Sequence, residues 1–192
     1  MMVQAFARGT DCSDVAPVDY SPAPLSIGHG ATCRKDLEDD YSVWLALDEL
    51  AQDVSHRMIA HECKAKSVYL YVKDNSFAYH EYHTSIHYPT QSAVILAQAA
   101  YELFVLNYRW EKPIRALTIT AGKLQDEKEP EQLDIFGDYQ RYDKKNRLDR
   151  AIDEIRNRFG KDAIKHASQC VSPTMLATDK CESVKLPGMM YR

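Results

Sequence analysis

The feature that most constrains the fold is a stretch of strict alternation, KSVYLYVKD, at residues 66–74. Apolar side chains occupy every second position, and Tyr or Lys side chains occupy the positions between them: Val68, Leu70 and Val72 against Tyr69, Tyr71 and Lys73. Successive side chains of a strand point to opposite faces, so this stretch predicts a strand with one buried face. DNS at residues 74–76 is typical of a turn, and FAYHEYHTSIHY at residues 77–88 favours a second strand, which completes a β-hairpin.

Two helices are expected around this hairpin. Between Asp40 and His61, apolar residues recur at steps of three and four, which marks one face of an amphipathic helix: Trp44, Leu47, Ala51, Val54 and Met58. Residues 91–109 are apolar except along a stripe that predicts a narrow solvated edge: Gln91, Gln98, Glu102 and Arg109. Pro89 is expected to end the strand before this second helix, and Thr90 is expected to cap the helix.

Glycines interrupt the first expected strand, LSIGHGATC at residues 25–33, where Gly28 and Gly30 indicate a bulge or the close approach of another backbone. PIRALTITAG at residues 113–122 predicts the last strand. The resulting order, β-α-β-β-α-β, predicts an α+β fold of the split βαβ type. This fold is a two-layer sandwich, in which a four-stranded sheet carries two helices on one face and leaves its other face open.

Both ends of the chain are expected to lie outside this sandwich. Residues 10–25 carry three prolines and no regular period, which is typical of a linker, and the preceding MVQAFARG looks like the last turn of a helix. Residues 141–168 contain a basic tail helix, expected from about Asn146 to Gly160, with an apolar stripe formed by Leu148, Ile152, Ile155 and Phe159. Residues 169–192 are expected to be disordered.

A short apolar group interrupts the acidic stretch between the last strand and the tail helix. In EQLDIFGD, residues 131–138, three large apolar side chains lie among Asp, Glu, Lys and Pro: Leu133, Ile135 and Phe136. Because burying apolar surface is worth roughly 25 cal/mol per Å², exposing these side chains needs a reason. They either bind a partner protein or pack as a local staple on the surface of the chain itself.

The charge, hydropathy and cysteine content exclude several classes of protein. The net charge of −4 argues against a strongly basic nucleic-acid binder, although residues 126–138 are acidic and residues 141–165 basic. No apolar run approaches the roughly 20 residues that span a bilayer, and the N-terminus lacks signal-peptide character, so we expect a cytoplasmic protein with no membrane partner. The five cysteines form no CxxC pair, which favours reduced thiols over a zinc site.

Several stretches, in this order, resemble the C-terminal part of Y-family translesion DNA polymerases of the UmuC/DinB class. The end of their thumb resembles FARGTDCSDVAP. The first strand of their little finger resembles SIGHGAT followed by KDL. The match continues through VYLYVKDNSF and PIRALTITAGKL. RLDRAIDEIRNRFGKDAIKHAS is similar to a tail helix of Gram-positive members. The resemblance covers about residues 5–168 and implies a division of the chain into the end of the thumb with a linker, the little finger, an acidic linker and the basic tail helix, at residues 1–24, 25–124, 125–140 and 141–168.

The resemblance implies that the open sheet face binds duplex or primer-template DNA through its phosphates, without reading sequence. The positions that match the family's contacts are Ser26, Ile27, Gly28, Gly30, Thr32, Tyr69, Tyr71, Lys73 and Arg115. The parity of Arg115 follows Leu117 and Ile119, which favours a role in bracing the helices instead. Leu25 stands where the family commonly has Lys, and Tyr71 and Tyr82 stand at positions that are often basic, so weak, non-specific DNA binding is expected.

QLDIF is similar to the pentapeptide Gln-Leu-x-Leu-Phe, by which bacterial polymerases and repair proteins hold the sliding clamp. The resemblance therefore implies a clamp-binding segment made of Gln132, Leu133, Asp134, Ile135 and Phe136. Apolar anchors that fill pockets carry most of the energy of such binding. The implied function is a little finger that binds damaged primer-template DNA and the clamp during DNA repair, lesion bypass and the SOS response.

The residues that would catalyse polymerisation are not found in the sequence. A polymerase needs carboxylates that hold two Mg²⁺ ions, and in this family they lie in a palm domain upstream of these residues. Asp39 and Asp40 precede a helix, which favours a role at the helix start. His80 has the opposite strand parity to His83 and His87, so no metal site is expected from them. We therefore expect no catalytic residue, no bound metal and no cofactor in this chain, and polymerisation only through a separate palm-bearing chain.

Two other functions remain open. A stand-alone clamp-binding regulator with little DNA affinity would fit the acidic balance and the missing cations. An RNA-binding ferredoxin-like module would need stacking aromatic residues in a pattern that KSVYLYVKD imitates only loosely. Clamp binding and DNA binding, measured with Leu133 and Phe136 changed to alanine, would separate the first of these from the polymerase module.

Overall fold

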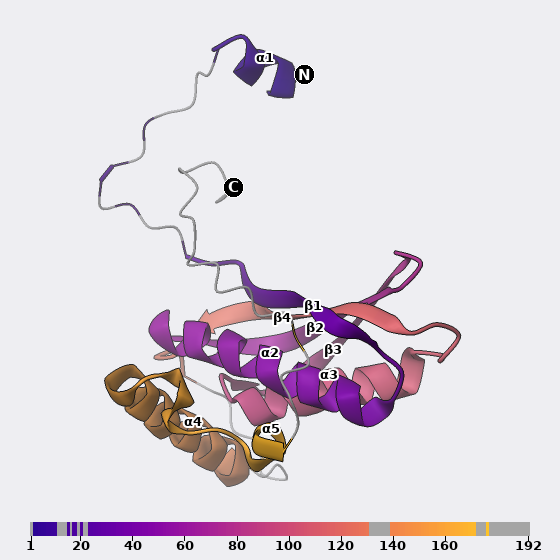
Figure 1. The fold of residues 1–192 in the computed structure, drawn as a ribbon. Coiled ribbons are helices and arrows are strands. Elements are labelled where there is room, and N and C mark those ends of the chain that lie inside the picture. Colours follow the sequence, from indigo (N-terminus) through magenta and orange to yellow (C-terminus); the bar gives the residue numbers. More distant parts are fainter. Residues whose placement is uncertain are drawn as a thin grey trace. The chain divides into compact units, whose positions relative to one another are not determined.

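The structure is a computed structural model that describes residues 2–10, 15, 17, 18, 20, 23–130, 139–171 and 176. By its contacts the chain divides into two units, Met1–Ala23 with Lys185–Arg192, and Pro24–Val184, each of which we describe by itself. The first unit contains helix α1, Met2–Ala7, where the sequence predicts the end of a helix. The second unit contains all the other helices and strands (Figure 1).

A four-stranded antiparallel sheet with two helices on one face forms the body of the second unit (Figure 1). In chain order its elements are β1 (Ser26–Leu37), α2 (Asp40–Ala60), β2 (Cys63–Asp74), β3 (Tyr79–Thr90), α3 (Ala93–Asn107) and β4 (Ile114–Asp126). The strand order is β1-β4-β2-β3, and every neighbouring pair is antiparallel. Because β4 lies between β1 and β2, these two run parallel with α2 connecting them, which confirms the predicted split βαβ fold.

The core lies between the sheet and the two helices, where the predicted periodicities place it. Val68, Leu70 and Val72 of β2 are fully buried, as the alternation predicts. On α2, Leu47, Ala51, Val54 and Met58 are fully buried, and Trp44 is half-buried at the rim. From α3, Leu96, Ala97, Ala100 and Phe104 complete the core. Each large side chain buried here contributes roughly 1.5–3 kcal/mol relative to exposure, so these matched stripes fix the sandwich.

The junction between β3 and α3 differs from the prediction. Thr90 is the last residue of β3, and Ser92 is the N-cap of α3, so Thr90 does not cap this helix. The Thr90 hydroxyl instead accepts a hydrogen bond from the Ser92 amide at 3.0 Å and donates one to Asn146 at 2.7 Å. Gln91 is fully buried rather than solvated, whereas Gln98 and Glu102 are exposed as predicted.

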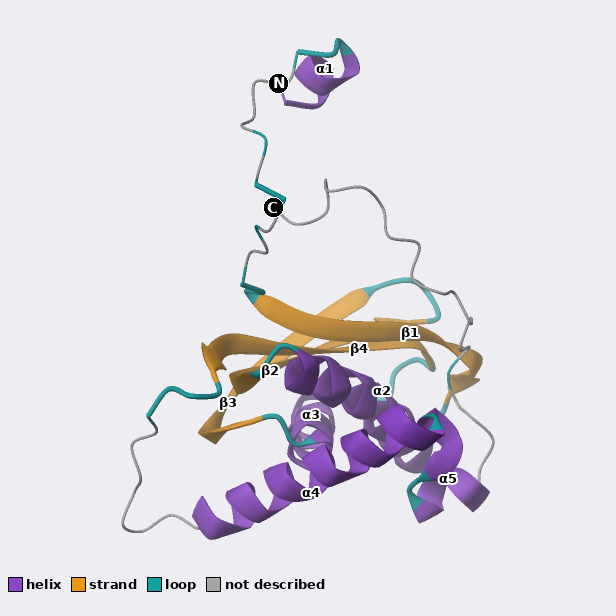
Figure 2. Ribbon diagram, turned by 90° about the vertical axis from the view of Figure 1, so that its left-hand side faces the viewer, coloured by secondary structure: helices purple, strands orange, loops and turns teal. Residues whose placement is uncertain are grey.

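A third layer covers the two helices on the side away from the sheet, as Figure 2 shows. It consists of α4 (Tyr139–Phe159), the 3-10 helix η1 (Lys161–Ala163) and the short α5 (Ala167–Val171). The tail helix therefore begins at Tyr139, earlier than the predicted Asn146. It ends before Gly160, as predicted, and this glycine has a φ of 98° that few other residues adopt. The Thr90–Asn146 hydrogen bond explains why Gln91 is buried, since α4 covers the start of α3.

The orientation of α4 is the largest difference from the sequence prediction. Its buried residues are polar: Asn146, Asp149 and Asp153. Of its apolar stripe, Leu148 is 57% exposed, Ile155 38% and Phe159 67%, and only Ile152 is half-buried. The helix is amphipathic as predicted, but it turns its polar face toward the domain because the surface of α2 that receives it is also polar.

One residue of the C-terminal stretch belongs to the core of the second unit. Leu176 is 1% exposed and forms an antiparallel bridge with Cys33 of β1. Its carbonyl accepts a hydrogen bond from Arg34 at 3.1 Å. The expected disorder of residues 169–192 therefore does not hold at Leu176, whose apolar side chain gains more by packing beside Cys33 than by staying in water.

The described cysteines, Cys33, Cys63 and Cys170, are free thiols, as expected. Cys33 and Cys63 are buried, and burial raises the pKa of Cys33 to about 12, so its reactive thiolate is disfavoured at neutral pH. None of the helices in the described part of the chain is long and apolar enough to cross a membrane.

Candidate nucleic-acid interface

The face of the sheet opposite the helices carries four rows of side chains, which the strand register defines. Residues paired across antiparallel strands point to the same face. In the order β1, β4, β2, β3, the rows are Ser26–Gly122–Ser67–Ser85, Gly28–Thr120–Tyr69–His83, Gly30–Thr118–Tyr71–Glu81 and Thr32–Ala116–Lys73–Tyr79. We call these residues the open face. They form the candidate interface with nucleic acid.

Glycines and threonines interlock along the β1 edge of the open face. A Cβ atom added to Gly28 would lie 2.4 Å from the Thr120 hydroxyl oxygen, and one added to Gly30 would lie 2.1 Å from that of Thr118. The threonine side chains therefore occupy the space above the glycines. The glycines are needed for this close approach, as the sequence predicts, although the neighbours are side chains and the bulge of β1 lies further on, between Thr32 and Leu37.

This packing predicts that Gly30→Ala destabilises the domain by about 1–2 kcal/mol, because the new methyl group overlaps Thr118. The measurement is urea denaturation followed by circular dichroism. In a Thr118→Gly background the same substitution should cost at least about 1 kcal/mol less, since the overlapping side chain is gone. An equal cost in both backgrounds would show that the two residues do not interlock.

Aromatic side chains cover the β2–β3 half of the open face. The ring of Tyr69 stacks on His83, with centroids 5.6 Å apart and an interplanar angle of 25°. Burial and a hydrogen bond with Glu81 raise the pKa of Tyr71, so this phenol stays neutral. The Lys73 ammonium lies 4.6 Å from the ring centre of Phe77 and 4.9 Å from that of Tyr79. This half therefore presents flat aromatic surfaces, one Lys ammonium and the Glu81 carboxylate.

The open face carries little net charge. Of the sixteen residues in its rows, Lys73 is the one Lys or Arg, and Glu81 is the one Asp or Glu. A further cation reaches the β1 edge from the helix side, since the Arg57 guanidinium of α2 donates to the Gly28 carbonyl. Nothing in the strand pattern predicts Arg57 here, because it comes from the last turn of a helix.

The structure brings together seven of the nine positions that match the family's DNA contacts. The open face contains Ser26, Gly28, Gly30, Thr32, Tyr69, Tyr71 and Lys73. Ile27 points the other way and is 6% exposed in the core, so its side chain cannot contact DNA on this face. Sequence reasoning missed His83, Thr118 and Thr120, whose place on this face follows from the register, which the sequence does not fix.

Arg115 and Tyr82 also lie differently from the expectations. Arg115 forms an ion pair with Asp36 of β1 at 3.1 Å, beside an irregularity of the register, so it links two strands and does not brace the helices. Tyr82 pairs with Leu70 and packs against the core, so it does not lie on the open face in place of a basic residue.

The segment that the sequence predicts to bind the clamp, Gln132–Phe136, lies outside the described residues, and ion pairs hold described residues on either side of it. Before it, Lys128 forms an ion pair with Glu62 at 2.9 Å. Glu127 forms another with Arg150 of α4, the helix that follows the segment. The residues just after β4 are therefore tied both to the turn that follows α2 and to α4.

The sequence predicts no metal site at the histidines of β3 or at Asp39 and Asp40, and the structure shows where these side chains lie. His80 and His83 point to opposite faces, since His80 lies against Tyr108 and His83 against Tyr69. Asp39 caps α2 by accepting from the Ser42 amide at 2.8 Å, and the hydrogen bonds from the Ser42 hydroxyl and amide lower the pKa of Asp39. Within the described ranges no group of three or more His, Cys, Asp or Glu residues could hold a metal ion.

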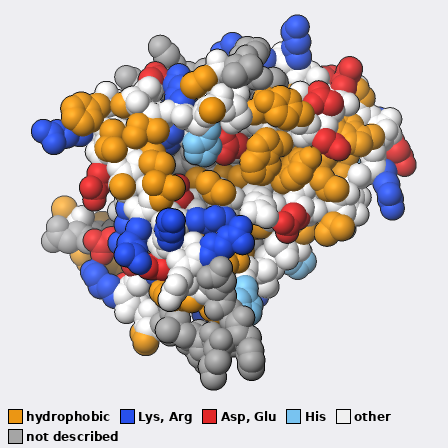
Figure 3. Space-filling view, turned by 90° about the horizontal axis from the view of Figure 1, so that it is seen from below, with side chains coloured by type: hydrophobic (Ala, Val, Ile, Leu, Met, Phe, Trp, Pro, Cys, Tyr) orange, Lys and Arg blue, Asp and Glu red, His pale blue; other side chains and the backbone are white. Residues whose placement is uncertain are grey.

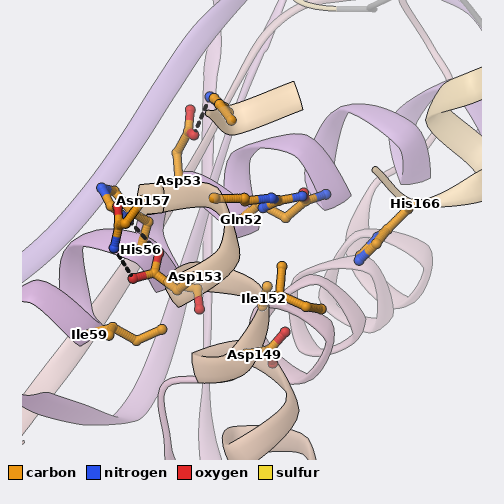
Figure 4. A pocket seen from close by; sticks show the side chains of 13 residues that line it. Gln52, Asp53, His56, Ile59, Asp149, Ile152, Asp153, Asn157 and His166 are labelled. Carbon is orange, nitrogen blue, oxygen red and sulfur yellow. Dashed lines mark hydrogen bonds and ion pairs between the residues drawn. The ribbon is translucent and has the colours of Figure 1, made fainter. Parts of the chain in front are cut away.

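A cavity of about 280 Å³, lined by both polar and apolar side chains, lies between α2 and α4 (Figure 4). His56 lies 2.5 Å from Asp153, and Arg156 donates to Gln52 at 2.7 Å. His166 lies 2.9 Å from Asp48, a hydrogen bond that raises the pKa of His166. The first two pairs join α4 to α2, and the third joins the segment between η1 and α5 to α2, so the cavity lies at the junction of the tail with the sandwich.

The pKa values of two carboxylates at this junction, Asp53 and Asp149, are shifted in opposite directions. Burial opposes the ionisation of Asp53, but the hydrogen bonds from His29 and Lys161 outweigh it and lower the pKa of Asp53 to about 2. Burial raises the pKa of Asp149, which accepts a hydrogen bond from the Ser92 hydroxyl. Asp53 therefore helps to hold η1 on α2 at every pH above about 4.

Comparison with known proteins identifies the class. Residues 24–135 match the model of the impB/mucB/samB family C-terminal domain. The chain is 31% identical over 156 residues to the DNA polymerase IV of Acetivibrio thermocellus, an alignment that covers 81% of this chain and 39% of the relative. It is 30% identical over 162 residues to DNA polymerase IV 2 of Bacillus subtilis, covering 79% of this chain and 38% of that one.

Among solved structures, the chain is similar to one described as a complex of beta-clamp processivity factor and little finger domain of PolIV. The TM-score is 0.45 and the identity 14%, over 58% of this chain and 99% of the other. A likeness at this level carries no functional weight.

The family match spans more than half of the chain, so the chain belongs to the impB/mucB/samB family through its C-terminal domain. This assignment confirms the resemblance of the sequence to the C-terminal region of Y-family DNA polymerases. The chain spans about two fifths of the length of the curated relatives that it matches.

Proposed function

We propose that this chain is a non-catalytic little finger that binds primer-template DNA through its open face and the bacterial sliding clamp through residues 132–136. The observation that supports it best is the open face itself, which the helices leave uncovered. Along its β1 edge, the side chains of Thr120 and Thr118 pack directly over Gly28 and Gly30. The threonine hydroxyls that cover these glycines would face a phosphate chain laid along the β1 edge and donate hydrogen bonds to it. Such contacts position DNA without reading its sequence, which suits a template that carries damage.

The charge of the open face supports weak binding to DNA. Each phosphate that a Lys or Arg neutralises releases counterions and adds affinity that falls as salt rises. Lys73 on the face and Arg57 at its β1 edge are the cations positioned for this role. The hydroxyls of Thr118 and Thr120 and the tyrosines of β2 would add neutral hydrogen bonds, which respond less to salt.

The chemistry of polymerisation would belong to another part of the protein or to another chain. The relatives are DNA polymerases, and polymerases of this kind use carboxylate-bound Mg²⁺ ions. The described residues do not fit such a site, because no cluster of carboxylates is among them. We therefore assign no catalytic step, metal or cofactor to these residues.

DNA binding tests this proposal. The chain should bind a primer-template duplex at low salt, with an affinity that falls steeply as salt rises. No measurable binding at low salt would contradict the DNA-binding half of the proposal.

Changing Lys73 to alanine should weaken the affinity about two- to fivefold and reduce the slope of log affinity against log salt by about one, because one phosphate contact is lost. Fluorescence anisotropy of a labelled duplex over a series of salt concentrations would measure both. Lys144→Ala removes an exposed cation from α4 and should change neither quantity. If both variants behave alike, the open face is not the DNA site.

The near-neutral open face also supports a second candidate function, a clamp-binding regulator that competes with polymerases and binds little DNA. The two functions share the clamp-binding segment and differ in the use of the open face. Strong clamp binding together with absent DNA binding at low salt would favour the regulator.

A further inference from the structure

The polar face of α4 fits a polar stripe on α2, and this match fixes the orientation of α4. The stripe on α2 contains Asp48, Gln52, Ser55 and His56, at the spacing of one helix face. From the tail side, Asp153, Arg156 and His166 bind His56, Gln52 and Asp48 respectively. Turning α4 over would leave Asp149 without Ser92 and Asp153 without His56, and would place apolar side chains on a polar surface, which is costly.

The fixed orientation leaves an apolar stripe on the outer face of α4. Leu148, Ala151, Ile155 and Phe159 are spaced by three, four and four residues, and all four are exposed. Leu148 and Phe159 expose 57% and 67% of their surface. The stripe runs about 16 Å along the helix, since each residue rises about 1.5 Å. We call these four residues the outer stripe, which is as long as the contact face of a short partner helix.

Basic residues surround the outer stripe. Lys144, Arg147 and Arg158 are exposed beside it, and the Arg158 guanidinium lies 5.2 Å from the centre of the Phe159 ring. On the same exposed surface Glu154 carries the opposite charge, and Asp143 is paired with Arg147. Figure 3 views the domain from the side of α4 and shows hydrophobic side chains next to a cluster of Lys and Arg. An occupant of this surface therefore needs apolar side chains flanked by negative charge.

We propose that the outer stripe docks an acidic amphipathic helix of a partner protein, in which Leu-like side chains pack on the stripe and Asp or Glu residues pair with Lys144, Arg147 and Arg158. Helix-in-groove and helix-on-helix recognition use apolar anchors at this spacing. A second copy of α4 is a poorer occupant, because its arginines would face those of the first copy. This site is separate from the DNA-binding and clamp-binding roles proposed above.

The proposal is tested with the full chain and two designed peptides of about five helical turns. One carries Leu on one face and Glu on both flanks, and the other has Lys in place of Glu. Fluorescence anisotropy should show that the acidic peptide binds at least about tenfold more tightly than the basic one, because only the acidic one complements the arginines. Ile155→Ser with Phe159→Ser should weaken this binding at least about tenfold.

The matched control is Leu106→Ser, which changes an apolar side chain that is 76% exposed on α3. It should leave peptide binding unchanged, and circular dichroism should show that all variants are folded, since the changed side chains lie on the surface. The proposal would be overturned if both peptides bound equally tightly, or if Leu106→Ser weakened the binding of the acidic peptide as much as the double variant does.

Three further results would assign the outer stripe to another occupant and would also overturn the proposal. The first is a dimer, seen by sedimentation, that the double variant abolishes. The second is binding to phosphatidylglycerol vesicles that the double variant abolishes, with no binding of the acidic peptide. The third is peptide binding that appears only when Leu133 and Phe136 are changed to alanine, which would show that residues 131–138 of the chain cover the stripe.

Discussion

Replacing Leu133 and Phe136 by alanine is expected to weaken the binding of this chain to the bacterial sliding clamp by at least about a hundredfold. The reason is that a short segment binds through very few side chains. Apolar anchors that fill pockets each carry about 2 kcal/mol or more, and two such losses leave Gln132 and Ile135 with too little contact area. Surface plasmon resonance with immobilised clamp would measure the effect directly.

The structure supplies a control for this experiment. Leu106 is also a large, exposed apolar residue, on α3, and Leu106→Ala should leave clamp binding unchanged. The double variant should also keep the circular dichroism spectrum and the DNA affinity of the parent chain, since residues 131–138 connect β4 to α4 and belong to neither. A clamp affinity within about threefold of the parent would show that QLDIF is not the clamp-binding segment.

The sandwich could be predicted because its local patterns agree with one another. The alternation in residues 66–74 fixes which side of β2 is buried, and the stripe of α2 matches that surface with side chains of suitable size. A sequence specifies one fold when its local patterns and its core packing point to the same structure, as they do here. The place of β4 between β1 and β2 could not be derived from periodicity, because strand order depends on contacts between residues far apart in the chain.

The candidate interface was predictable to the extent that strand parity governs it. Parity places Tyr69, Tyr71 and Lys73 on the open face correctly. It fails at Arg115, where an irregularity of the register shifts the pattern and lets Ile114, not Arg115, enter the core. The contribution of Arg57 needs the tertiary structure, because it joins a helix end to a strand edge 29 residues away in sequence.

The orientation of α4 shows why an amphipathic pattern alone does not identify the buried face. The pattern shows that one face of the helix is apolar and the other polar, and in most amphipathic helices the apolar face is the buried one. Here the receiving surface on α2 is polar, and the hydrogen-bonded pairs across it decide the orientation. The polar residues of α2 at positions 48, 52, 55 and 56 were the available signal, since a stripe of this kind needs a polar partner.

The second large effect is expected from His166→Ala, which should destabilise the docked tail by about 2 kcal/mol at about pH 6. His166 contributes to two contacts with Asp48, whose side chain is only 4% exposed. Removing the imidazole leaves a buried carboxylate with hydrogen bonds from Gln52 and Gln169 but without its cationic partner. These remaining donors keep the cost below the 3–5 kcal/mol that a fully buried broken pair can reach.

The effect of His166→Ala should depend on pH, with a sign that follows from the raised pKa of His166. A histidine whose pKa is raised on folding binds its proton more tightly in the folded state. Its contribution to the free energy of unfolding is therefore complete below about pH 6.5, the unfolded value, and is lost as the pH rises through the folded pKa. The parent and the variant should differ most in mildly acidic buffer and least in alkaline buffer.

Urea denaturation from about pH 6 to pH 9, followed by circular dichroism, would measure this dependence. Asp48→Asn retains hydrogen-bonding capacity but removes the charge, so it should abolish the difference between acidic and alkaline conditions. His61→Ala changes an exposed histidine directly after α2 and should have little effect at any pH. If His166→Ala instead costs most in alkaline buffer, the His166–Asp48 contact does not act as an ion pair, and α4 must be held on α2 mainly by its other polar contacts.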